Sequence, residues 1–295
     1  MITAVAASPG AGRLRAFLEL GKLRLSALAV FAVVAGLFLG YPGIPPLGLV
    51  LATTAGTFLV AAGGNALNMY LERDRDLLMD RTKGRPLPTG RLRPAEVLAF
   101  GLASGLGGLA LLAAASNLLA TAICGLIFVS YVMVYTPMKR LTHLNTLVGA
   151  VPGGLPPVVG YAAGAGLVDQ KALLLFFILF FWQVPHFLAI AWRYREDYRR
   201  GGMQMLPVLD PAGTSTARQM IAYGMALVVS TLLAGVLEIS GGLYLIVALF
   251  LGVLLMVPVL LGALLRTEAT MRACFLATIV YLPLLFAVMV LDRAP

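Results

Sequence analysis

The sequence predicts an all-α, polytopic membrane protein with about nine transmembrane helices around a central cavity. The chain has 295 residues, of which 60% are hydrophobic and only 12% charged, and its mean hydropathy is +0.92. Because a soluble domain carries about 25% charged residues, a water-soluble protein with an unusually large core is a poor alternative. Apolar runs of roughly 20 residues recur along the chain, and none alternates as a barrel strand would.

Nine apolar segments are long enough to cross a bilayer as helices. They cover residues 23–40, 48–71, 95–115, 118–137, 144–163, 171–192, 218–238, 242–264 and 272–291. The N-terminus has no apolar core ahead of its basic residues, unlike a cleaved signal peptide. We therefore expect a flexible cytoplasmic tail over residues 1–21 and a single transmembrane domain over residues 22–295.

The loops between these segments alternate in charge. All but two of the 22 Lys and Arg residues fall in the N-terminal tail and the loops after the even-numbered spans; the exceptions are Lys171 and Arg293. The positive-inside rule then predicts an inner (cytoplasmic) membrane protein whose N-terminus and basic loops are cytoplasmic and whose C-terminus is outside. The net charge of +9 favours anionic lipids and ligands. Nucleic acid is not an expected partner, because the bases lie at membrane depth and not on a soluble domain.

Charged side chains cluster where the second span ends, in the stretch NMYLERDRDLLMDRTKGRPLP. Asn68, Glu72, Asp76 and Asp80 are four residues apart, so they form one stripe on a helix, whereas Asp74 faces elsewhere. Carboxylates on one face repel each other unless a cation lies between them, and carboxylate and amide oxygens suit Mg²⁺. The stripe therefore predicts a magnesium site.

Basic side chains follow the stripe at Arg81, Lys83 and Arg85, and such donors suit phosphate oxygens. Acids for a metal beside bases for phosphate indicate a metal–diphosphate site. The alternative is a solvated loop of mixed charges. Acids this close to a membrane are costly and are usually functional.

A second basic loop reads YTPMKRLTHLN. Tyr135 and Lys139 are four residues apart, so they share a face if the helix continues past Pro137. Lys139, with Arg140 beside it, is expected to bind the diphosphate. The alternative for this loop is a simple positive-inside anchor.

The third basic stretch reads WQVPHFLAIAWRYREDYRRGGMQMLP. It places His186 deep in an apolar span, followed by four arginines at Arg193, Arg195, Arg199 and Arg200. A lone histidine on an apolar face is more often a core residue than a ligand. The arginines are too dense to mark topology alone, so they predict an anionic ligand. Upstream, VPGGLPPVVGY is expected to break the fifth span. The broken backbone would line a cavity, or the small residues would allow close helix packing.

These stretches together resemble the UbiA-type intramembrane prenyltransferase superfamily over roughly residues 20–290. The first matches its motif N-x-x-x-[DE]-x-x-x-D followed by R-T-x-x-R-P-L-P, at Asn68, Glu72, Asp76, Arg81, Thr82, Arg85, Pro86, Leu87 and Pro88. The second resembles the Y-x-x-x-K motif at Tyr135 and Lys139. The resemblance implies a UbiA-type fold and an enzyme that uses a prenyl diphosphate with Mg²⁺, with catalytic residues Asn68, Glu72, Asp76 and Lys139.

The third stretch departs from the superfamily pattern, because the expected second aspartate-rich motif is missing and Glu196 and Asp197 are its only acids. Its pattern W-Q-x-P-H-F…D-Y…M-L-P resembles the branch that farnesylates haem. That resemblance implies farnesyl diphosphate and haem b as substrates and haem O as product, for a downstream haem A synthase or terminal oxidase. The implied haem-binding residues are Trp182, Gln183, His186, Arg193 and Arg195, and arginines suit the haem propionates.

Two other functions remain open from the residues alone. One is a prenyltransferase of the same architecture that acts on an aromatic or quinone-precursor acceptor. The other is a transporter or haem-binding membrane protein without catalysis, which would not require a metal–diphosphate site. His186 and His143 both remain candidate ligands of the haem iron.

Overall fold

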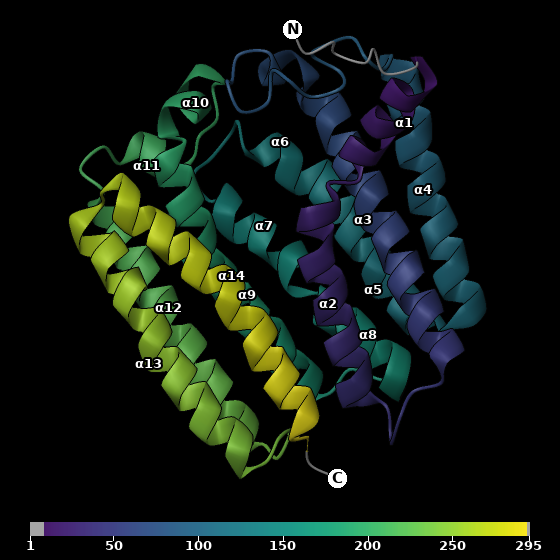
Figure 1. Ribbon diagram of the computed structural model, residues 1–295, viewed down its shortest axis with the longest axis vertical. Helices are drawn as coiled ribbons and strands as arrows, with labels where there is room; N and C mark the ends of the chain where they lie inside the picture. The colour runs from purple at the N-terminus through teal and green to yellow at the C-terminus, as the bar shows by residue number, and fades with distance from the viewer. Residues whose placement is uncertain (1–8, 294–295) are drawn as a thin grey trace, which may run out of the picture.

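The computed structural model describes residues 9–293 and is almost wholly helical (Figure 1). Within that range the extended pairing is one bridge between Ser240 and Arg293. Eight helical segments are long and apolar enough to cross a membrane, and the shorter apolar stretch Ser26–Gly40 accounts for the ninth expected span. The chain is therefore a multi-pass helical membrane protein, as its hydropathy predicts.

The helices begin and end within a few residues of the predicted spans. They are α1 (Pro9–Leu20), α2 (Leu23–Gly40), α3 (Leu47–Asp76), α4 (Pro94–Ala115), α5 (Leu118–Val129), the π-helix η1 (Ser130–Tyr135), α6 (Thr136–Met138), α7 (Asn145–Gly154), α8 (Pro156–Ala165), α9 (Gln170–Arg193), α10 (Arg195–Arg200), α11 (Leu206–Leu209), α12 (Thr214–Val236), α13 (Gly242–Leu265) and α14 (Glu268–Leu291). The largest difference is at α3, which runs five residues past the predicted end of its span.

The segment expected to be a flexible tail is largely the helix α1; residues 1–8 of that prediction lie outside the described residues. Ala16 and Leu20 are buried on one face of α1 in a cluster with residues of α3 and α4. On the exposed side, Glu19 accepts a hydrogen bond of 2.7 Å from Arg91. Packing of this apolar face against α3 and α4 stabilises the helix. The segment is too short for its helical pattern to be recognised from the sequence alone.

The helices form two groups that pack side by side (Figure 1). In one group α3 packs against α4, and α2 packs against α8. In the other group α12 packs between α9 and α13, and α14 packs against both α9 and α13. The largest buried cluster includes Trp182, Tyr244 and Phe286 of this second group and extends to α2 and α8 of the first. Many large apolar side chains, including Leu249 and Phe250 on α13, are exposed, as expected of a surface that faces lipid.

The fifth span is broken into α7 and α8 around Leu155, which confirms the break predicted from VPGGLPPVVGY. Small residues then bring backbones together: a Cβ added at Gly160 would overlap the carbonyl of Val33 on α2. On the other side of the break, a Cβ at Gly153 would overlap the side chain of Gln183 on α9. Of the two interpretations of this stretch, cavity lining and close helix packing, these contacts show close helix packing.

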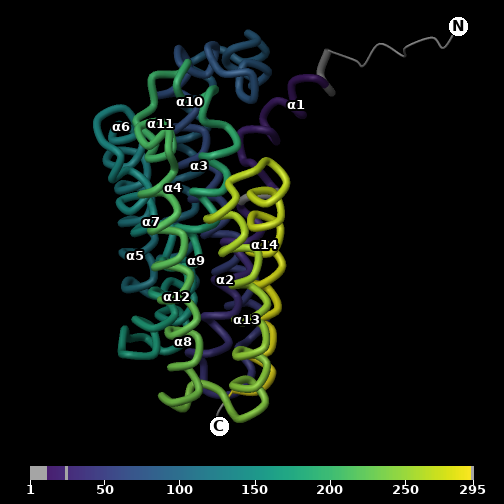
Figure 2. The backbone as a smooth tube through the Cα atoms, turned by 90° about the vertical axis from the view of Figure 1, so that its left-hand side faces the viewer, coloured from purple at the N-terminus to yellow at the C-terminus, as the bar shows by residue number. Residues whose placement is uncertain are grey.

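The three basic stretches gather at one end of the bundle. Figure 1 shows the loop after α3, together with α6, α10 and α11, at the end opposite the C-terminus, and Figure 2 shows the same grouping from the side. Short loops join the spans in successive pairs, so the two spans of each pair run in opposite directions. The fold thereby places three motifs that are far apart in the sequence at one membrane surface.

Candidate active site

The last two turns of α3 carry the acidic stripe on a buried face. The exposed fractions of Asn68, Glu72 and Asp76 are 1%, 6% and 0%, whereas the side chain of Asp74 is 85% exposed. Residues four apart therefore lie on one buried face of the helix, as the helical period predicts. Buried carboxylates are rare unless they are paired, so their partners define the site.

Each buried acid is paired with one cation from a different loop. Lys139 Nζ lies 2.8 Å from Glu72 Oε1, and Arg85 Nη1 lies 2.7 Å from Asp76 Oδ2. Although burial disfavours its charge, the Glu72 carboxylate raises the pKa of Lys139 above its usual value, so Lys139 is charged. The structure thus brings together the acids of the first motif and the lysine of the second.

Tyr135 and Lys139 share a face, as predicted. The helix continues through Pro137, with Lys139 N donating to Tyr135 O at 3.3 Å, and Lys139 Nζ lies 4.7 Å from the centre of the Tyr135 ring. The preceding π-helix, Ser130–Tyr135, inserts extra backbone into the turn and changes which residues face α3. A tyrosine face stabilises a nearby ammonium group, so Tyr135 helps to hold Lys139 toward Glu72.

The residues of the stripe fit a magnesium ion. Asn68 Nδ2 donates to Thr136 Oγ1 at 3.0 Å, which leaves Oδ1 free as an oxygen ligand. One amide oxygen and two carboxylates suit Mg²⁺, which takes few protein ligands and completes its shell with water and phosphate. Among the residues that the structure describes, no three His, Cys, Asp or Glu side chains group as metal ligands, so other oxygens would complete the shell. Thr136 was not singled out by the sequence.

Asp80 lies apart from the stripe. The helix ends at Asp76, so the four-residue spacing no longer places Asp80 on the same face. Its carboxylate is exposed and pairs with Lys83 Nζ at 2.6 Å and with Arg200 Nη2 at 2.5 Å. The structure therefore gathers three of the four expected metal ligands and leaves the fourth among surface charges.

The expected phosphate donors divide in the same way. Arg85 lies at the stripe, whereas Lys83 is exposed beside Asp80. Arg81 turns toward α10, where its Nη2 donates to Tyr198 Oη at 2.7 Å and its guanidinium lies 4.3 Å from the centre of that ring. Among these donors, Arg85 is therefore the one that contacts a buried acid of the site.

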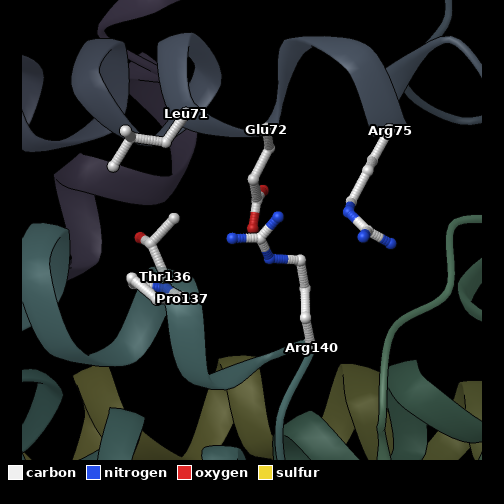
Figure 3. Close-up of a pocket in the computed structure, with 6 residues that line it drawn as sticks. All are labelled: Leu71, Glu72, Arg75, Thr136, Pro137 and Arg140. Atoms are coloured by element: carbon white, nitrogen blue, oxygen red, sulfur yellow. The ribbon is translucent and has the colours of Figure 1, made fainter.

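A small pocket of about 60 Å³ opens beside Glu72. Figure 3 shows the guanidinium of Arg140 turned toward the Glu72 carboxylate, with Arg75 on the far side of the pocket. Thr136, Pro137 and Leu71 complete its lining. This volume has room for an ion and a few waters, and Arg140 lines it together with Glu72 of the first motif.

Lys22 is a further basic residue near this site, and its position in the sequence did not single it out. It follows α1 with a left-handed backbone, φ 45° and ψ 53°, which is uncommon for a residue other than glycine. Burial and the nearby charges of Arg85 and Lys139 lower the pKa of Lys22, and Glu72 and Asp76 oppose the shift; together they bring the pKa to about 7. A lysine just ahead of a first span is typical of a topology signal, so its position in the sequence gave no sign of this role.

Asp197 ties the third stretch to the first. Its carboxylate is 8% exposed and accepts hydrogen bonds from the backbone N–H groups of Asp80 at 3.4 Å and Arg81 at 3.2 Å. It also contacts Arg200. In the sequence Asp197 is one of two acids where a second metal-binding motif was expected. Its carboxylate oxygens instead fix the loop that follows α3.

The residues predicted to bind haem are on α9 and just after it. Trp182, Gln183 and His186 are buried, and Gln183 Nε2 donates to Leu179 O at 3.0 Å. Because His186 and Arg193 are seven residues apart, they lie on one face of α9, roughly 10 Å apart along its axis. Arg195 lies past the end of the helix, with its guanidinium 4.8 Å from the centre of the Trp192 ring.

Charge and aromatic contacts surround this second group. Arg193 Nη2 lies 2.7 Å from Glu268 Oε1 at the start of α14. His186 stacks on Trp182 with ring centres 4.7 Å apart, and its Nδ1 lies 2.8 Å from Thr278 Oγ1. His143 is exposed in the loop after α6. His186 is therefore the histidine that lies within the bundle.

Comparisons with known proteins agree with this arrangement. A model of the UbiA prenyltransferase family matches residues 29–290. The protoheme IX farnesyltransferase of Solibacter usitatus (strain Ellin6076) is 45% identical over 289 residues, covering 95% of this chain and 99% of that protein. The protoheme IX farnesyltransferase of Koribacter versatilis (strain Ellin345) is 39% identical, covering 97% and 96%.

Solved structures share the fold. A structure described under the biosynthesis of digeranylgeranylglyceryl phosphate synthase in membranes has a TM-score of 0.75, with 17% identity and coverage of 95% of this chain and 98% of that one. The apo UbiA homologue from Aeropyrum pernix K1 has a TM-score of 0.70, 20% identity and coverage of 90% and 95%. The UbiA homologue from Archaeoglobus fulgidus bound to DMAPP and Mg²⁺ has a TM-score of 0.64, 17% identity and coverage of 92% and 98%.

Proposed function

The chain belongs to the UbiA prenyltransferase family, and from that premise we propose that it transfers a farnesyl group from farnesyl diphosphate to a vinyl group of haem b. The products are haem O and diphosphate. The relatives at 39% and 45% identity over nearly the whole chain, which carry the name protoheme IX farnesyltransferase, support this acceptor. The reaction supplies haem for terminal oxidases, and a downstream haem A synthase or the oxidase itself is the expected recipient.

The observation that carries the proposal is the pair of buried ion pairs, Glu72 with Lys139 and Asp76 with Arg85. Two acids and two cations are balanced within the protein, and the same four charges suit a metal ion and a diphosphate. Lys139 and Arg85 turn their donors to phosphate oxygens, and Asn68, Glu72 and Asp76 are left to hold Mg²⁺. When bound, Mg²⁺ neutralises charge that builds on the leaving diphosphate.

The protein's own residues meet the remaining needs of the reaction. The allylic carbon–oxygen bond of farnesyl diphosphate breaks, and its electrons leave with the diphosphate, where Lys139 and Arg85 offset the charge. The π electrons of the vinyl group form the new carbon–carbon bond. Water adds to the resulting cation and loses a proton, which gives the hydroxyl of haem O. The apolar spans exclude other water from the allylic cation.

The residues proposed to bind the haem acceptor lie on α9 and just after it. His186 and Arg193 share one face of that helix, so a porphyrin lying against it presents its iron toward the histidine and its propionates toward the membrane surface. Arg193 and Arg195 supply the charge-assisted hydrogen bonds that suit carboxylates. Trp182 and Gln183 are on the same helix. A second aspartate-rich motif at this place would repel the propionates.

We also propose that the protein lies in the cytoplasmic membrane with the active site facing the cytoplasm. The basic loops gather at the same end of the bundle as the acidic stripe (Figure 1), and basic loops remain on the cytoplasmic side. Farnesyl diphosphate carries a charged head, so a site at that surface accepts it without moving the charge through the bilayer.

The proposal is tested by the mass of the product. Purified protein in lipid nanodiscs is incubated with farnesyl diphosphate, Mg²⁺ and equal amounts of haem b and an aromatic acid. We expect the haem to gain one farnesyl group and one hydroxyl group, and the aromatic acid to stay unchanged. A farnesylated aromatic acid with unmodified haem would identify the other acceptor class. No transfer to either acceptor would contradict the prenyltransferase function.

A further inference from the structure

A hydrogen-bonded unit joins α9 to α14 beside the proposed haem site. His186 Nδ1 lies 2.8 Å from Thr278 Oγ1, and Trp182 Nε1 donates to the backbone oxygen of Thr278 at 2.8 Å. The three residues are buried, with exposed fractions of 8% for His186, 4% for Trp182 and 0% for Thr278. Phe275 packs against the histidine with ring centres 5.0 Å apart. The orientation of the imidazole ring is therefore fixed by two helices.

The hydrogen bonds of Thr278 favour one tautomer of the neutral histidine. The Thr278 hydroxyl has one proton, and it donates that proton to Phe275 O at 2.7 Å. A hydroxyl oxygen has two lone pairs, so Thr278 Oγ1 accepts at the contact with His186. The donor of that hydrogen bond is then Nδ1–H, and the neutral imidazole carries its lone pair on Nε2.

Nε2 is the polar atom of this unit that is left for a ligand. It makes no hydrogen bond with any residue that the structure describes. It is also not among the fully enclosed polar atoms without a partner in that part of the chain, which are the hydroxyls of Thr53, Thr57 and Ser116. Nε2 is therefore not fully enclosed by the residues that the structure describes. An imidazole lone pair inside an apolar bundle is costly unless it finds a donor or a metal.

We propose that Thr278 is a positioning residue that holds His186 as the Nδ1–H tautomer, so that Nε2 is presented to the iron of the haem substrate. This inference rests on the proposed function. Histidines that bind metals donate their second ring N–H to an oxygen, which fixes both tautomer and ring angle. The Thr278 hydroxyl supplies that oxygen, and its own proton is held by Phe275 O.

The test compares Thr278→Val with Thr278→Ser. Each variant in nanodiscs is titrated with ferric haem b, and the optical and electron paramagnetic resonance spectra are recorded. We expect Thr278→Ser to match the wild type. Thr278→Val keeps the side-chain volume but removes the hydroxyl, so haem b should bind about 10-fold more weakly or worse, with a changed spectrum. His186→Ala should lose the histidine signature, and His143→Ala should keep it.

A second probe separates positioning from a general loss of structure. Metal-free protoporphyrin IX has no iron for Nε2 to bind, so Thr278→Val should bind it as tightly as the wild type does. Thr53→Val is the matched control, because it removes a buried hydroxyl that has no hydrogen-bond partner. Equal loss of both porphyrins in Thr278→Val would assign Thr278 a structural role and overturn the inference.

Two further results would also overturn it. One is a Thr278→Val protein whose haem b spectrum and affinity equal those of the wild type. The other is a His186→Ala protein that keeps the wild-type spectrum. Haem farnesylation by the wild type is measured in the same preparations. Its presence beside either result leaves the proposed function intact, and its absence contradicts the function separately.

Discussion

At the scale of single residues, the site is defined by which charges are buried together. Glu72 and Asp76 point into the bundle, and each meets one cation from another part of the chain, whereas Asp74, in the same helix, faces outward. The buried pairs are held by hydrogen bonds and little screened by water. Neighbouring exposed pairs, such as Lys83 with Asp80, are worth little to stability.

The first prediction concerns the acids. Glu72→Gln and Asp76→Asn keep the side-chain volumes and remove the charges, so Mg²⁺-dependent farnesyl transfer should fall by about 100-fold or more. Asp74→Asn should change the rate little, because that carboxylate is exposed. The rates are measured by product mass under saturating Mg²⁺. A loss at Asp74→Asn greater than at the other two positions would contradict the assignment of Glu72 and Asp76 to the active face of the helix.

The second prediction concerns the cost of a broken pair. Lys139→Met leaves the Glu72 carboxylate buried without its partner and should destabilise the protein by about 3–5 kcal/mol. The double variant Lys139→Met with Glu72→Gln should recover most of that loss. Lys83→Met is the control and should cost less than about 1 kcal/mol. The measurement is denaturant unfolding in detergent micelles, and equal losses at positions 139 and 83 would contradict the buried pair.

At the scale of elements, close helix contacts place the stripe. Gly63 on α3 lies opposite Gly101 and Gly105 on α4, and a Cβ at Gly63 would lie 2.6 Å from the Gly101 oxygen and 2.6 Å from the Gly105 nitrogen. Both of these atoms are backbone, so the helices themselves would have to move. Asn68 begins the stripe little more than one turn further along the same helix, so the α3–α4 contact positions the active-site acids.

The third prediction follows from that contact. Gly63→Ala should destabilise the protein by about 1–3 kcal/mol through overpacking and should lower the transfer rate, because α3 shifts. Gly107→Ala on α4 is the matched control, since nothing lies within 4 Å of the added Cβ. That variant should be neutral or more stable by up to about 1 kcal/mol. Thermal unfolding and product mass measure both effects; a neutral Gly63→Ala would exclude the tight contact.

At the scale of the whole molecule, the fold collects three distant loops at one membrane surface. α3 contributes the acids, the loop after α6 contributes Lys139, and α10 contributes Asp197, which binds the loop after α3. The connections at the opposite end of the bundle, such as the one between α2 and α3, carry none of these motifs. The molecule is thus polarised along the membrane normal.

The fourth prediction tests that polarity. A cysteine replacing Ile44, an exposed residue between α2 and α3, should react with a membrane-impermeant maleimide on intact spheroplasts. A cysteine replacing Lys83 should react only after the membrane is opened. The native Cys124 and Cys274 are fully buried, so background labelling should be low. The reverse labelling pattern would contradict the proposed orientation and place the active site on the outer side of the membrane.

Much of the fold follows from the sequence because lipid imposes simple rules. A chain in hydrocarbon must satisfy its backbone within each helix, so the nine apolar segments correspond to the eight long helices and the shorter stretch Ser26–Gly40 of the described structure. The helical period also placed Asn68, Glu72 and Asp76 on one buried face. Where the rules are weaker the prediction was incomplete: α1 was expected to be a flexible tail, and Asp80 was expected to continue a stripe that ends with the helix.

What the sequence by itself determined is therefore local: the spans, the buried stripe, the face shared by Tyr135 and Lys139, and the arginines that follow His186. What only the tertiary structure decided is which groups meet across the chain. Lys22 lies near enough to feel the charges of Glu72, Asp76, Arg85 and Lys139. Asp197 binds a loop instead of a metal, and Thr278 bonds His186 from 92 residues away. Periodicity acts within one helix, whereas these contacts depend on how separate helices pack, which no spacing along the chain encodes.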